Sequence, residues 1–391
     1  MSARQKKGGL SRRDLAKGAA VTGAFMAIGA GTAPEGQKEA AMPDTVFDVK
    51  AFGAKGDGKA DDSEAIQKAL DAAGEKRAAT FVPPGTYLCA DLKMHRNSAL
   101  TGMPAWGYGR QPGGSILKLA HDKAKCVLDM AGAVGSTVDG LSFDGGKLGK
   151  DICGISIVKD DYATEDALRV ERCQVARFSG DALRMAKVWC FTVRHSMFAF
   201  SANGINCEGW DGFVLDCWMS GNNGFGYGPG DVCSVTMTSN RVEWNKEGGI
   251  VLIDGSHYNV TGNYIDRSGK AGIAILAGAA LGGSKIMSVT GNLIYRSGKW
   301  ADPESYDSSQ VRLEGASGVT FIGNTMTVGQ DDAQKGNFSP SYGIVYGKLT
   351  NCVIKDNVLH NGALKKLMVD LGEHGEGVIV ADNPGCLKKI G

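Results

Sequence analysis

Apolar and polar residues alternate over most of the chain, and this pattern predicts short β-strands separated by tight turns. Residues 45–54 alternate in this way, and residues 80–87 form a second strand around a Pro-Pro-Gly turn. Between them, Asp61 and Asp62 supply N-cap chemistry for a helix. Its predicted apolar face, at helical spacing, consists of Ala65, Ile66, Ala69, Leu70 and Ala73.

The same segment carries several short motifs of a known family. They are Phe52-Gly53-Ala54, Gly56-Asp57-Gly58, Asp61-Asp62, Ala65-Ile66-Gln67 and Val82-Pro83-Pro84-Gly85-Thr86-Tyr87. On these residues the segment resembles the start of the pectate-lyase-like superfamily, in its rhamnogalacturonase and epimerase branch. The resemblance implies a right-handed parallel β-helix whose first helix covers the end of the solenoid, where apolar core would otherwise be exposed.

From about residue 133 a weak repeat of 22–23 residues follows. One repeat position is held by Cys173, His195, Cys217, Asn240, Asn263, Asn292, Asn324, Asn357 and Asn383. We expect this row to face inward as an asparagine ladder, with each amide bonding the backbone of the next coil, and a buried His195 to be structural. The prediction is an all-β fold over residues 42–391: a single right-handed parallel β-helix of about ten coils with an N-terminal capping α-helix.

Alternation along the strands also predicts which residues face outward. Two positions after the ladder should face inward: Val175, Met197, Met219, Val242, Ile265 and Ile294. Three positions after the ladder should face outward: Ala176, Phe198, Ser220, Glu243, Asp266, Tyr295, Thr327 and His360. Because neighbouring coils stack about 4.8 Å apart, three of these residues are predicted to form a row of ionisable groups on successive coils. They are Glu243, Asp266 and Tyr295.

This row and the turn before the following strand supply the candidate catalytic residues. They are Glu243, Asp266, Tyr295, Glu247 and Lys270, and the same turn row includes Asp181, Asn203 and Asn222-Asn223. Glycoside hydrolysis needs two carboxyl groups about 5–9.5 Å apart, which Glu243 would form with Asp266 or Glu247. β-Elimination or epimerisation of a uronate needs a base and an enolate-stabilising cation, for which Tyr295 and Lys270 are suited. The sequence leaves the three reactions open.

Candidate substrate-binding residues come from the same coils and from insertions at 277–285, 299–308 and 329–341. They are Arg267, Arg296, Trp244, Trp300, Asp331 and Asp332. Arginine suits sugar carboxylates and tryptophan suits sugar rings, and the last two insertions are expected to wall a groove beside the row. Acidic residues of these loops are candidate Ca²⁺ ligands, although no calcium motif is complete.

Composition narrows the class of protein. The 43 basic and 42 acidic residues give a net charge of +1, which argues against nucleic acid as a partner. Fifty-seven glycines with only 10 prolines indicate many tight turns rather than disorder. The ten cysteines include no C-x-x-C pair and are expected to be mostly buried thiols.

Residues 1–41 are predicted to be an export signal with a linker. Positions 1–17 contain six basic residues, and an uncharged stretch follows at 18–31. At 14 residues this stretch is too short to span a membrane. Ser11-Arg12-Arg13-Asp14-Leu15-Ala16-Lys17 resembles the twin-arginine motif. The resemblance implies passage through the twin-arginine export machinery and a periplasmic or secreted protein without a membrane span in the mature chain.

Together these features predict an exported carbohydrate-active protein that acts on an acidic polysaccharide by β-elimination, epimerisation or hydrolysis. The alternative is a non-catalytic β-helix that binds glycan or belongs to the cell envelope, because this fold carries unrelated functions. A cleft with converging charged groups would favour catalysis, and a flat solvated surface would favour binding. The sequence indicates neither the sugar nor the oligomeric state.

Overall fold

The computed structural model describes residues 46–107, 112–229, 233–279 and 282–390. The predicted export signal, residues 1–41, lies outside the described residues. Within them the chain is almost entirely β-structure, with 36 strands and one α-helix, α1 (Ser63–Lys76). Short 3-10 helices occur at Val49–Phe52 and Asp332–Gln334.

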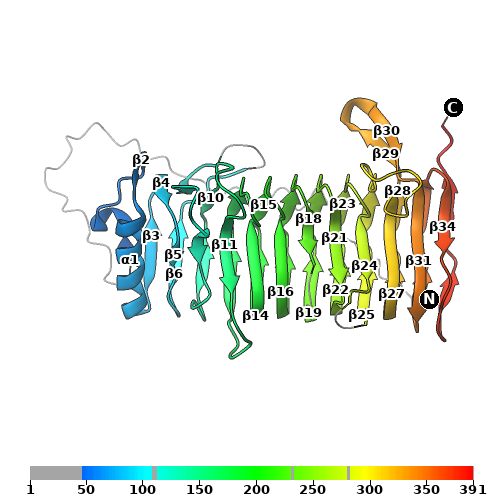
Figure 1. Ribbon diagram of the computed structural model, residues 1–391, viewed down its shortest axis with the longest axis horizontal. Helices are drawn as coiled ribbons and strands as arrows, with labels where there is room; N and C mark the ends of the chain where they lie inside the picture. The colour runs from blue at the N-terminus through cyan, green and yellow to red at the C-terminus, as the bar shows by residue number, and fades with distance from the viewer. Residues whose placement is uncertain (1–45, 108–111, 230–232, 280–281, 391) are drawn as a thin grey trace, which may run out of the picture. The chain divides into compact units, whose positions relative to one another are not determined.

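The strands stack along one axis into a parallel β-helix with three faces (Figure 1), so the predicted fold class is confirmed. The short-strand face comprises β2 (Asp57–Asp61), β4 (Gly85–Cys89), β7 (Ser115–Leu119), β10 (Ser142–Asp144), β13 (Gln174–Ala176), β15 (Met197–Ala199), β17 (Trp218–Ser220), β20 (Arg241–Glu243), β23 (Tyr264–Asp266), β26 (Leu293–Tyr295), β28 (Thr325–Thr327), β33 (Val358–Ala363) and β36 (Gly385–Leu387). Ten of these thirteen strands follow residue 133, where the repeat was recognised, and three precede it.

Two further faces are joined by long strands that bend between them. The pocket face comprises β5 (Leu92–Lys93), β8 (Cys126–Asp129), β11 (Cys153–Val158), the first parts of β14 (Leu183–Arg194), β16 (Ile205–Leu215) and β27 (Ser309–Ile322), β18 (Phe225–Gly228), β21 (Gly248–Ile253), β24 (Ile273–Leu276), β31 (Tyr342–Thr350) and β34 (Lys366–Asp370). The back face comprises β1 (Val46–Asp48), β3 (Ala79–Val82), β6 (Ala99–Gly102), β9 (Thr137–Asp139), β12 (Leu168–Glu171), the second parts of β14, β16 and β27, β19 (Cys233–Thr238), β22 (Ser256–Thr261), β25 (Ser284–Thr290), β32 (Val353–Lys355) and β35 (Ile379–Ala381).

Helix α1 lies across the first coils at one end of the stack, as predicted (Figure 1). Its buried residues are Ile66, Ala69, Leu70 and Ala73, which join the core of the solenoid. The predicted cap is confirmed for Asp61, which accepts the N–H of Ser63 at 2.9 Å, but not for Asp62. Asp62 occupies the N-cap position, but its carboxylate accepts the N–H groups of Lys55 and Gly56, at 2.7 and 3.0 Å, and so fixes the preceding turn.

The inward asparagine ladder is present. Asn240 donates from Nδ2 to Oδ1 of Asn263 at 2.9 Å, and that oxygen also accepts the N–H of Asn240 at 3.0 Å. The same pattern continues through Asn292, Asn324 and Asn357 to Asn383. Each ladder amide thereby satisfies backbone groups that have no access to water.

His195 is not a member of this row, contrary to the prediction. Ser196 takes the ladder place, and its Oγ accepts the N–H of Cys173 at 3.1 Å. His195 has φ 49°, like Asp216 and Ser239, which precede ladder residues at φ 52° and 59°. Its side chain is half exposed and lies 3.3 Å from the Asp216 carboxylate.

The one-residue shift at Ser196 reverses two further predictions, because successive strand residues face opposite sides. Phe198 lies in the core, in register with Val175 and Met219, and Met197 faces outward. Met197 is nevertheless buried, because it packs with Ala176 and Ala199 against Trp106 from a loop on the short-strand face.

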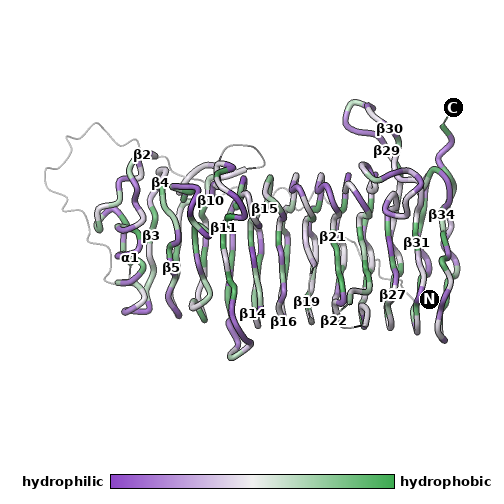
Figure 2. The backbone as a smooth tube through the Cα atoms, viewed as in Figure 1, coloured by the Kyte–Doolittle hydropathy of each residue, from purple (hydrophilic) through white to green (hydrophobic). Residues whose placement is uncertain are grey.

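A second inward row at the next turn was missed. Asn222 accepts the N–H of Ser201 at 3.1 Å and donates to Oδ1 of Asn245 at 2.8 Å. Asn222 is therefore an internal residue and not part of an outward turn row, whereas the adjacent Asn223 is exposed. Figure 2 shows hydrophobic and hydrophilic residues alternating along the stacked strands, while the projecting hairpin of β29 (Gly329–Asp331) and β30 (Lys335–Ser339) is mostly hydrophilic.

The turn after the short strand is left-handed in several coils. Phe200, Trp244, Arg267 and Arg296 have φ of 54°, 59°, 53° and 49°, a conformation that residues with a Cβ rarely adopt. This turn sets Arg267 and Arg296 directly beside the outward ends of β23 and β26.

Candidate functional site

The predicted ionisable row exists as a row, but it is covered. Glu243, Asp266 and Tyr295 are direct partners on β20, β23 and β26. Their side chains point away from the core, yet Glu243 is only 3% exposed and Asp266 only 1% exposed. Alternation therefore predicts the direction of these side chains and not their access to solvent.

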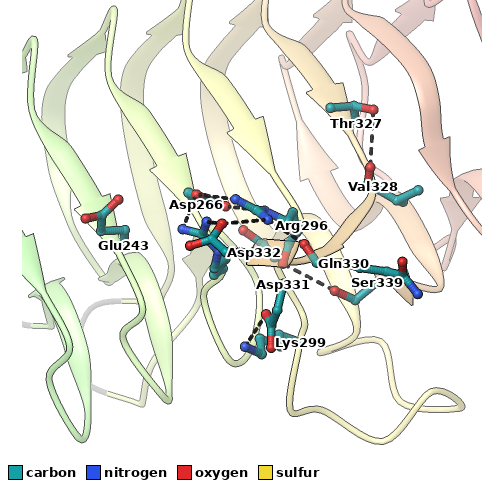
Figure 3. Close-up of polar contacts among 12 residues, drawn as sticks. Glu243, Asp266, Arg296, Lys299, Thr327, Val328, Gln330, Asp331, Asp332 and Ser339 are labelled. Atoms are coloured by element: carbon teal, nitrogen blue, oxygen red, sulfur yellow. Dashed lines mark hydrogen bonds and ion pairs between the residues drawn. The ribbon is translucent and has the colours of Figure 1, made fainter. Parts of the chain in front are cut away.

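Asp266 lies between two arginines on adjacent coils (Figure 3). Its carboxylate accepts from Arg267 Nη1 at 2.6 Å and from Arg296 Nε and Nη2 at 2.9 and 3.1 Å. The side chains of Arg267 and Arg296 are only 7% and 9% exposed. The solenoid thus provides one carboxylate for two buried guanidinium groups.

Burial and charge act against each other at this cluster. Burial raises the pKa of the Asp266 carboxyl above its ordinary value, although the hydrogen bond from Arg296 and the charge of Arg267 act in the opposite direction. Burial lowers the pKa of the Arg296 guanidinium, but the hydrogen bond and charge of Asp266 outweigh it, and the net shift is upward. Asp266 therefore gives up its proton less readily than an exposed aspartate does.

The β29–β30 hairpin provides the remaining carboxylates. Asp332 pairs with Arg267 and lies 3.6 Å from Nη1 of Arg296, which also donates to the carbonyl of Gln330. Asp331 pairs with Lys299 of the preceding insertion. Figure 3 shows Asp332 beside Asp266 and Arg296, with the Asp331–Lys299 pair below them. The insertion 329–341 therefore lies over the arginines beside Asp266 instead of walling an open groove next to the row.

The predicted aromatic residues differ in access. Trp244 has Arg267 on its ring at 4.2 Å and Lys299 Nζ at 4.2 Å, so cations occupy this ring. Trp300 is 49% exposed and lies 5.1 Å from Lys299 Nζ. Of the two tryptophans, Trp300 has the ring that a sugar can reach.

The carboxyl groups of Glu243 and Asp266 do not form an accessible catalytic pair in this geometry. Glu243 accepts from Arg241 Nε at 2.8 Å and from Trp218 Nε1 at 3.1 Å. Tyr295 is half-buried, with Arg296 over its ring at 4.0 Å and the backbone of Gly329 against its hydroxyl. The catalytic roles assigned to Glu243, Asp266 and Tyr295 stay predictions. Access to Glu243 would require Trp218 or Arg241 to move, and access to Asp266 and Tyr295 would require the hairpin to move.

Glu247 and Lys270 lie on the other side of the turn, at the pocket face. They form an ion pair of 2.5 Å with half-exposed side chains, and their hydrogen bond raises the pKa of Lys270. They line a pocket of about 380 Å³ together with Asp307 and Arg312, which form a second ion pair at 2.5 Å. The floor is apolar and consists of Phe225, Val251, Ile253, Ala274 and Leu276. The insertion at 299–308 thus contributes to both faces, because Asp307 lines this pocket while Lys299 pairs with Asp331 of the hairpin.

The same face has a polar pocket of about 490 Å³, which the sequence did not predict, although two of its lining residues belong to the predicted turn row. At its floor Asp181 accepts from Asn203 at 2.7 Å, from Asn206 at 3.0 Å and from Arg184 at 3.3 Å. Asp181 and Asn203 were part of the predicted turn row. Arg184 and Asn206 are register partners on β14 and β16, and outward alternation from Leu183 and Ile205 would have identified them.

A third pocket, of about 500 Å³, adjoins the polar pocket and shares Ser156 and Val158 with it. Lys93, Lys125, Asp91 and Asp129 line its other side. The pocket face therefore carries three hollows over strands from β5 to β27.

The acidic loop residues considered for Ca²⁺ have basic partners. Asp307 pairs with Arg312, Glu304 with Lys365 and Asp331 with Lys299. In the described part of the chain, no three His, Cys, Asp or Glu side chains come together as a metal site. Calcium binding stays a prediction.

The nine cysteines whose side chains the structure describes are free thiols, and six of them are buried. Burial raises the pKa values of Cys173 and Cys217, two ladder-row residues, to about 12. Across the described segments, none of the helices has the length and apolar character needed to cross a membrane.

Comparisons with known proteins agree with this architecture. Residues 46–108 match the family model "Rhamnogalacturonase A/epimerase, pectate lyase-like", and residues 132–281 match "Right handed beta helix region". The chain is a right-handed parallel β-helix protein. The two matches support its placement in the pectate-lyase-like superfamily.

Curated proteins match short segments of this β-helix protein, and two of them are as follows. The chain is 55% identical over 42 residues to alginate lyase 7 of Azotobacter vinelandii and 44% identical over 62 residues to the non-secreted LysM effector LysM19 of Penicillium expansum. These segments are 10% and 16% of this chain, and each spans only 5% of the relative's length.

Solved structures match nearly the whole β-helix. The A-module of the mannuronan C-5 epimerase AlgE4 of Azotobacter vinelandii superposes with a TM-score of 0.57 at 18% identity, covering 88% of this chain and 100% of that one. The DFA-IIIase of Arthrobacter chlorophenolicus A6 without its lid, in complex with GF2, gives 0.59 at 14% identity, covering 87% and 94%. At these identities the likeness establishes the fold alone.

Proposed function

We propose that this β-helix protein acts on an acidic polysaccharide that lies along the pocket face. The three pockets follow one another across parallel strands, so a glycan along the solenoid axis would pass one strand about every 4.8 Å. The relatives named for alginate lyase and mannuronan epimerase activity add support by analogy.

The observation that carries the proposal is the charge arrangement at the 380 Å³ pocket. Glu247, Lys270, Asp307 and Arg312 surround an open hollow that also has apolar surface for a sugar ring. Of the five predicted catalytic residues, Glu247 and Lys270 are the two that line this open pocket. Glu247 would move the proton, while Lys270 and Arg312 would hold the sugar carboxylate and stabilise the charge that develops on it.

The polar pocket would bind an adjacent sugar. Asp181 holds Asn203, Asn206 and Arg184 in place from two successive coils, which orients their polar groups before a ligand arrives. The Arg184 side chain is 43% exposed and presents a planar fork of donors suited to a carboxylate. An acidic sugar is therefore a better match than a neutral one.

Incubation with polygalacturonate, alginate and neutral polysaccharides tests this proposal, with detection of reducing ends, unsaturated products and C5 inversion by NMR. Glu247→Gln should lower the rate on the active substrate by about 100-fold or more, because a general acid–base group is lost. Glu373→Gln is the matched control, since Glu373 forms an exposed pair with Lys348 at 3.4 Å on a different coil. Equal activity of both variants would refute the assignment of Glu247.

Non-catalytic glycan binding is the second candidate, and one observation favours it. Glu247 and Asp307 are each engaged in an ion pair of 2.5 Å, so neither carboxylate is unpartnered in the pocket. This function predicts binding of an acidic polysaccharide without any product across the whole panel. Product formation that Glu247→Gln abolishes would exclude it.

A further inference from the structure

Three cations converge on the outer side of the covered row. Arg267, Arg296 and Lys299 lie next to one another, and among the described residues of the stacked coils Asp266 is the one carboxylate that contacts the two arginines. The other carboxylates that contact the three cations, Asp331 and Asp332, belong to the projecting β29–β30 hairpin. The charge of the cluster is thus balanced by a segment outside the stacked coils.

The hairpin satisfies this cluster incompletely. The Arg267 side chain is more than nine-tenths buried, and its Nε has no hydrogen-bond partner among the residues that the structure describes. Asp332, which pairs with the same guanidinium, has a side chain that is 76% exposed. An unpaired buried donor on a charged group is costly, so the cluster retains capacity for a further acceptor.

We propose that Arg267, Arg296 and Lys299 form a binding site for a carboxylate-bearing glycan, and that Asp331 and Asp332 occupy this site until such a ligand displaces them. The site lies on the short-strand face, across the turn from the pocket that contains Glu247 and Lys270. It therefore goes beyond the proposed function and does not depend on the chemistry at Glu247.

The chemistry of the cluster defines the class of ligand. A guanidinium fork matches a planar carboxylate, and three cations on adjacent coils match two carboxylates better than one. Trp300, half exposed beside Lys299, offers an open ring face next to these charges. A short chain of acidic sugars offers carboxylates to the three cations and a sugar ring to Trp300, whereas a neutral glycan offers only the ring.

Calorimetric titration of the full chain with trigalacturonate tests the site. The Asp331→Asn/Asp332→Asn variant removes the internal competitor and should bind the probe at least 10-fold more tightly than the wild type. Adding Lys299→Gln to this variant should remove most of the gain. Asp302→Asn/Glu304→Gln is the matched control, because it removes the same charge from the neighbouring insertion and should change affinity little.

Limited trypsin digestion after Lys335, an exposed residue of the hairpin, reports on displacement. Cleavage should be faster in Asp331→Asn/Asp332→Asn, and also in the wild type when trigalacturonate is added. An unchanged affinity in the variant, or a gain equal to that of the Asp302/Glu304 control, would overturn the proposal even if cleavage accelerates. Failure of Glu247→Gln to affect activity bears only on the pocket face, so the two proposals fail separately.

Discussion

Glu243 and Glu247 are four residues apart, yet they belong to two faces with opposite character. On the short-strand face, Trp218 and Arg241 cover Glu243, and two arginines held by the hairpin cover Asp266. On the pocket face, Glu247 and Lys270 form an equally close ion pair that stays half exposed. The difference shows that an outward position in a β-helix is accessible only where neither long neighbouring side chains nor an insertion covers it.

The largest expected difference between the two faces is in how much the free energy of unfolding falls when an acidic side chain is removed. Asp266→Ala would leave two buried guanidinium groups without their shared carboxylate, and should lower the free energy of unfolding by about 3–5 kcal/mol. Glu247→Ala breaks a half-exposed pair and should cost less than about 1 kcal/mol. Urea unfolding of both variants measures this. Equal losses would mean that the row on the short-strand face is not sealed in solution.

The inward ladder beneath both faces should show an intermediate effect. Asn263→Ala removes an amide that serves Asn240, Asn292 and the carbonyl of Met237, and should cost about 1–3 kcal/mol. Asn223→Ala is the control, because this asparagine is exposed and its side chain has Lys246 as its one polar partner among the described residues. A loss of stability at Asn223 as large as that at Asn263 would contradict the internal role of the ladder.

On the pocket face, substitution should affect binding and leave stability nearly unchanged. Arg184→Ala should weaken binding of trigalacturonate by about 10-fold, equivalent to about 1.4 kcal/mol. Its free energy of unfolding should change by less than about 0.5 kcal/mol, as for other exposed substitutions. Arg169→Ala removes the same charge from the back face and provides the control. If the two variants bind alike, the polar pocket is not a binding site.

The smallest effect concerns how the stability contributed by two carboxylates, Asp370 and Asp266, depends on pH. At the C-terminal end of the pocket face, hydrogen bonds from the Gly372 N–H and from His374 lower the pKa of Asp370, whereas burial raises the pKa of Asp266. The stability that Asp370 contributes is present above its unfolded pKa and lost as pH falls through its folded pKa. The contribution of Asp266 has the opposite sign, because it is present below the unfolded pKa and lost as pH rises through the folded pKa.

NMR titration of the carboxyl carbons checks this difference directly, with Asp370→Asn and Asp266→Asn identifying the two signals. Asp370 should titrate below the ordinary range and Asp266 above it. The difference in stability between the wild type and Asp370→Asn should shrink as the solution becomes more acidic. Coincident titration of both carboxylates would show that the two faces do not differ in electrostatic environment.

Much of the fold could be predicted because its determinants are local and repeated. The motifs around Gly56-Asp57-Gly58 predict the capped first coils, and Asn240 to Asn357 recur at the spacing of a coil. The register failed at His195, where serine replaces asparagine in the ladder and a left-handed turn residue precedes it. A histidine beside a serine carries no local sign of which one faces inward.

The sequence could predict which residues lie together at the site, but not whether a ligand or solvent can reach them. Asp266, Arg267 and Arg296 do lie together, because coil spacing brings equivalent positions side by side. The contact between Arg267 and Asp332 joins residues 65 positions apart and depends on how the hairpin folds back. Residue spacing within the repeat contains no information about the direction in which an insertion projects, so the cover over this row was not foreseen.

The left-handed turns at Trp244, Arg267 and Arg296 also bear on protein engineering. A residue with a Cβ costs on the order of 1–3 kcal/mol in such a conformation, and glycine avoids most of this strain. A search for thermostable variants would therefore select glycine at these three positions and would remove the groups that hold the hairpin.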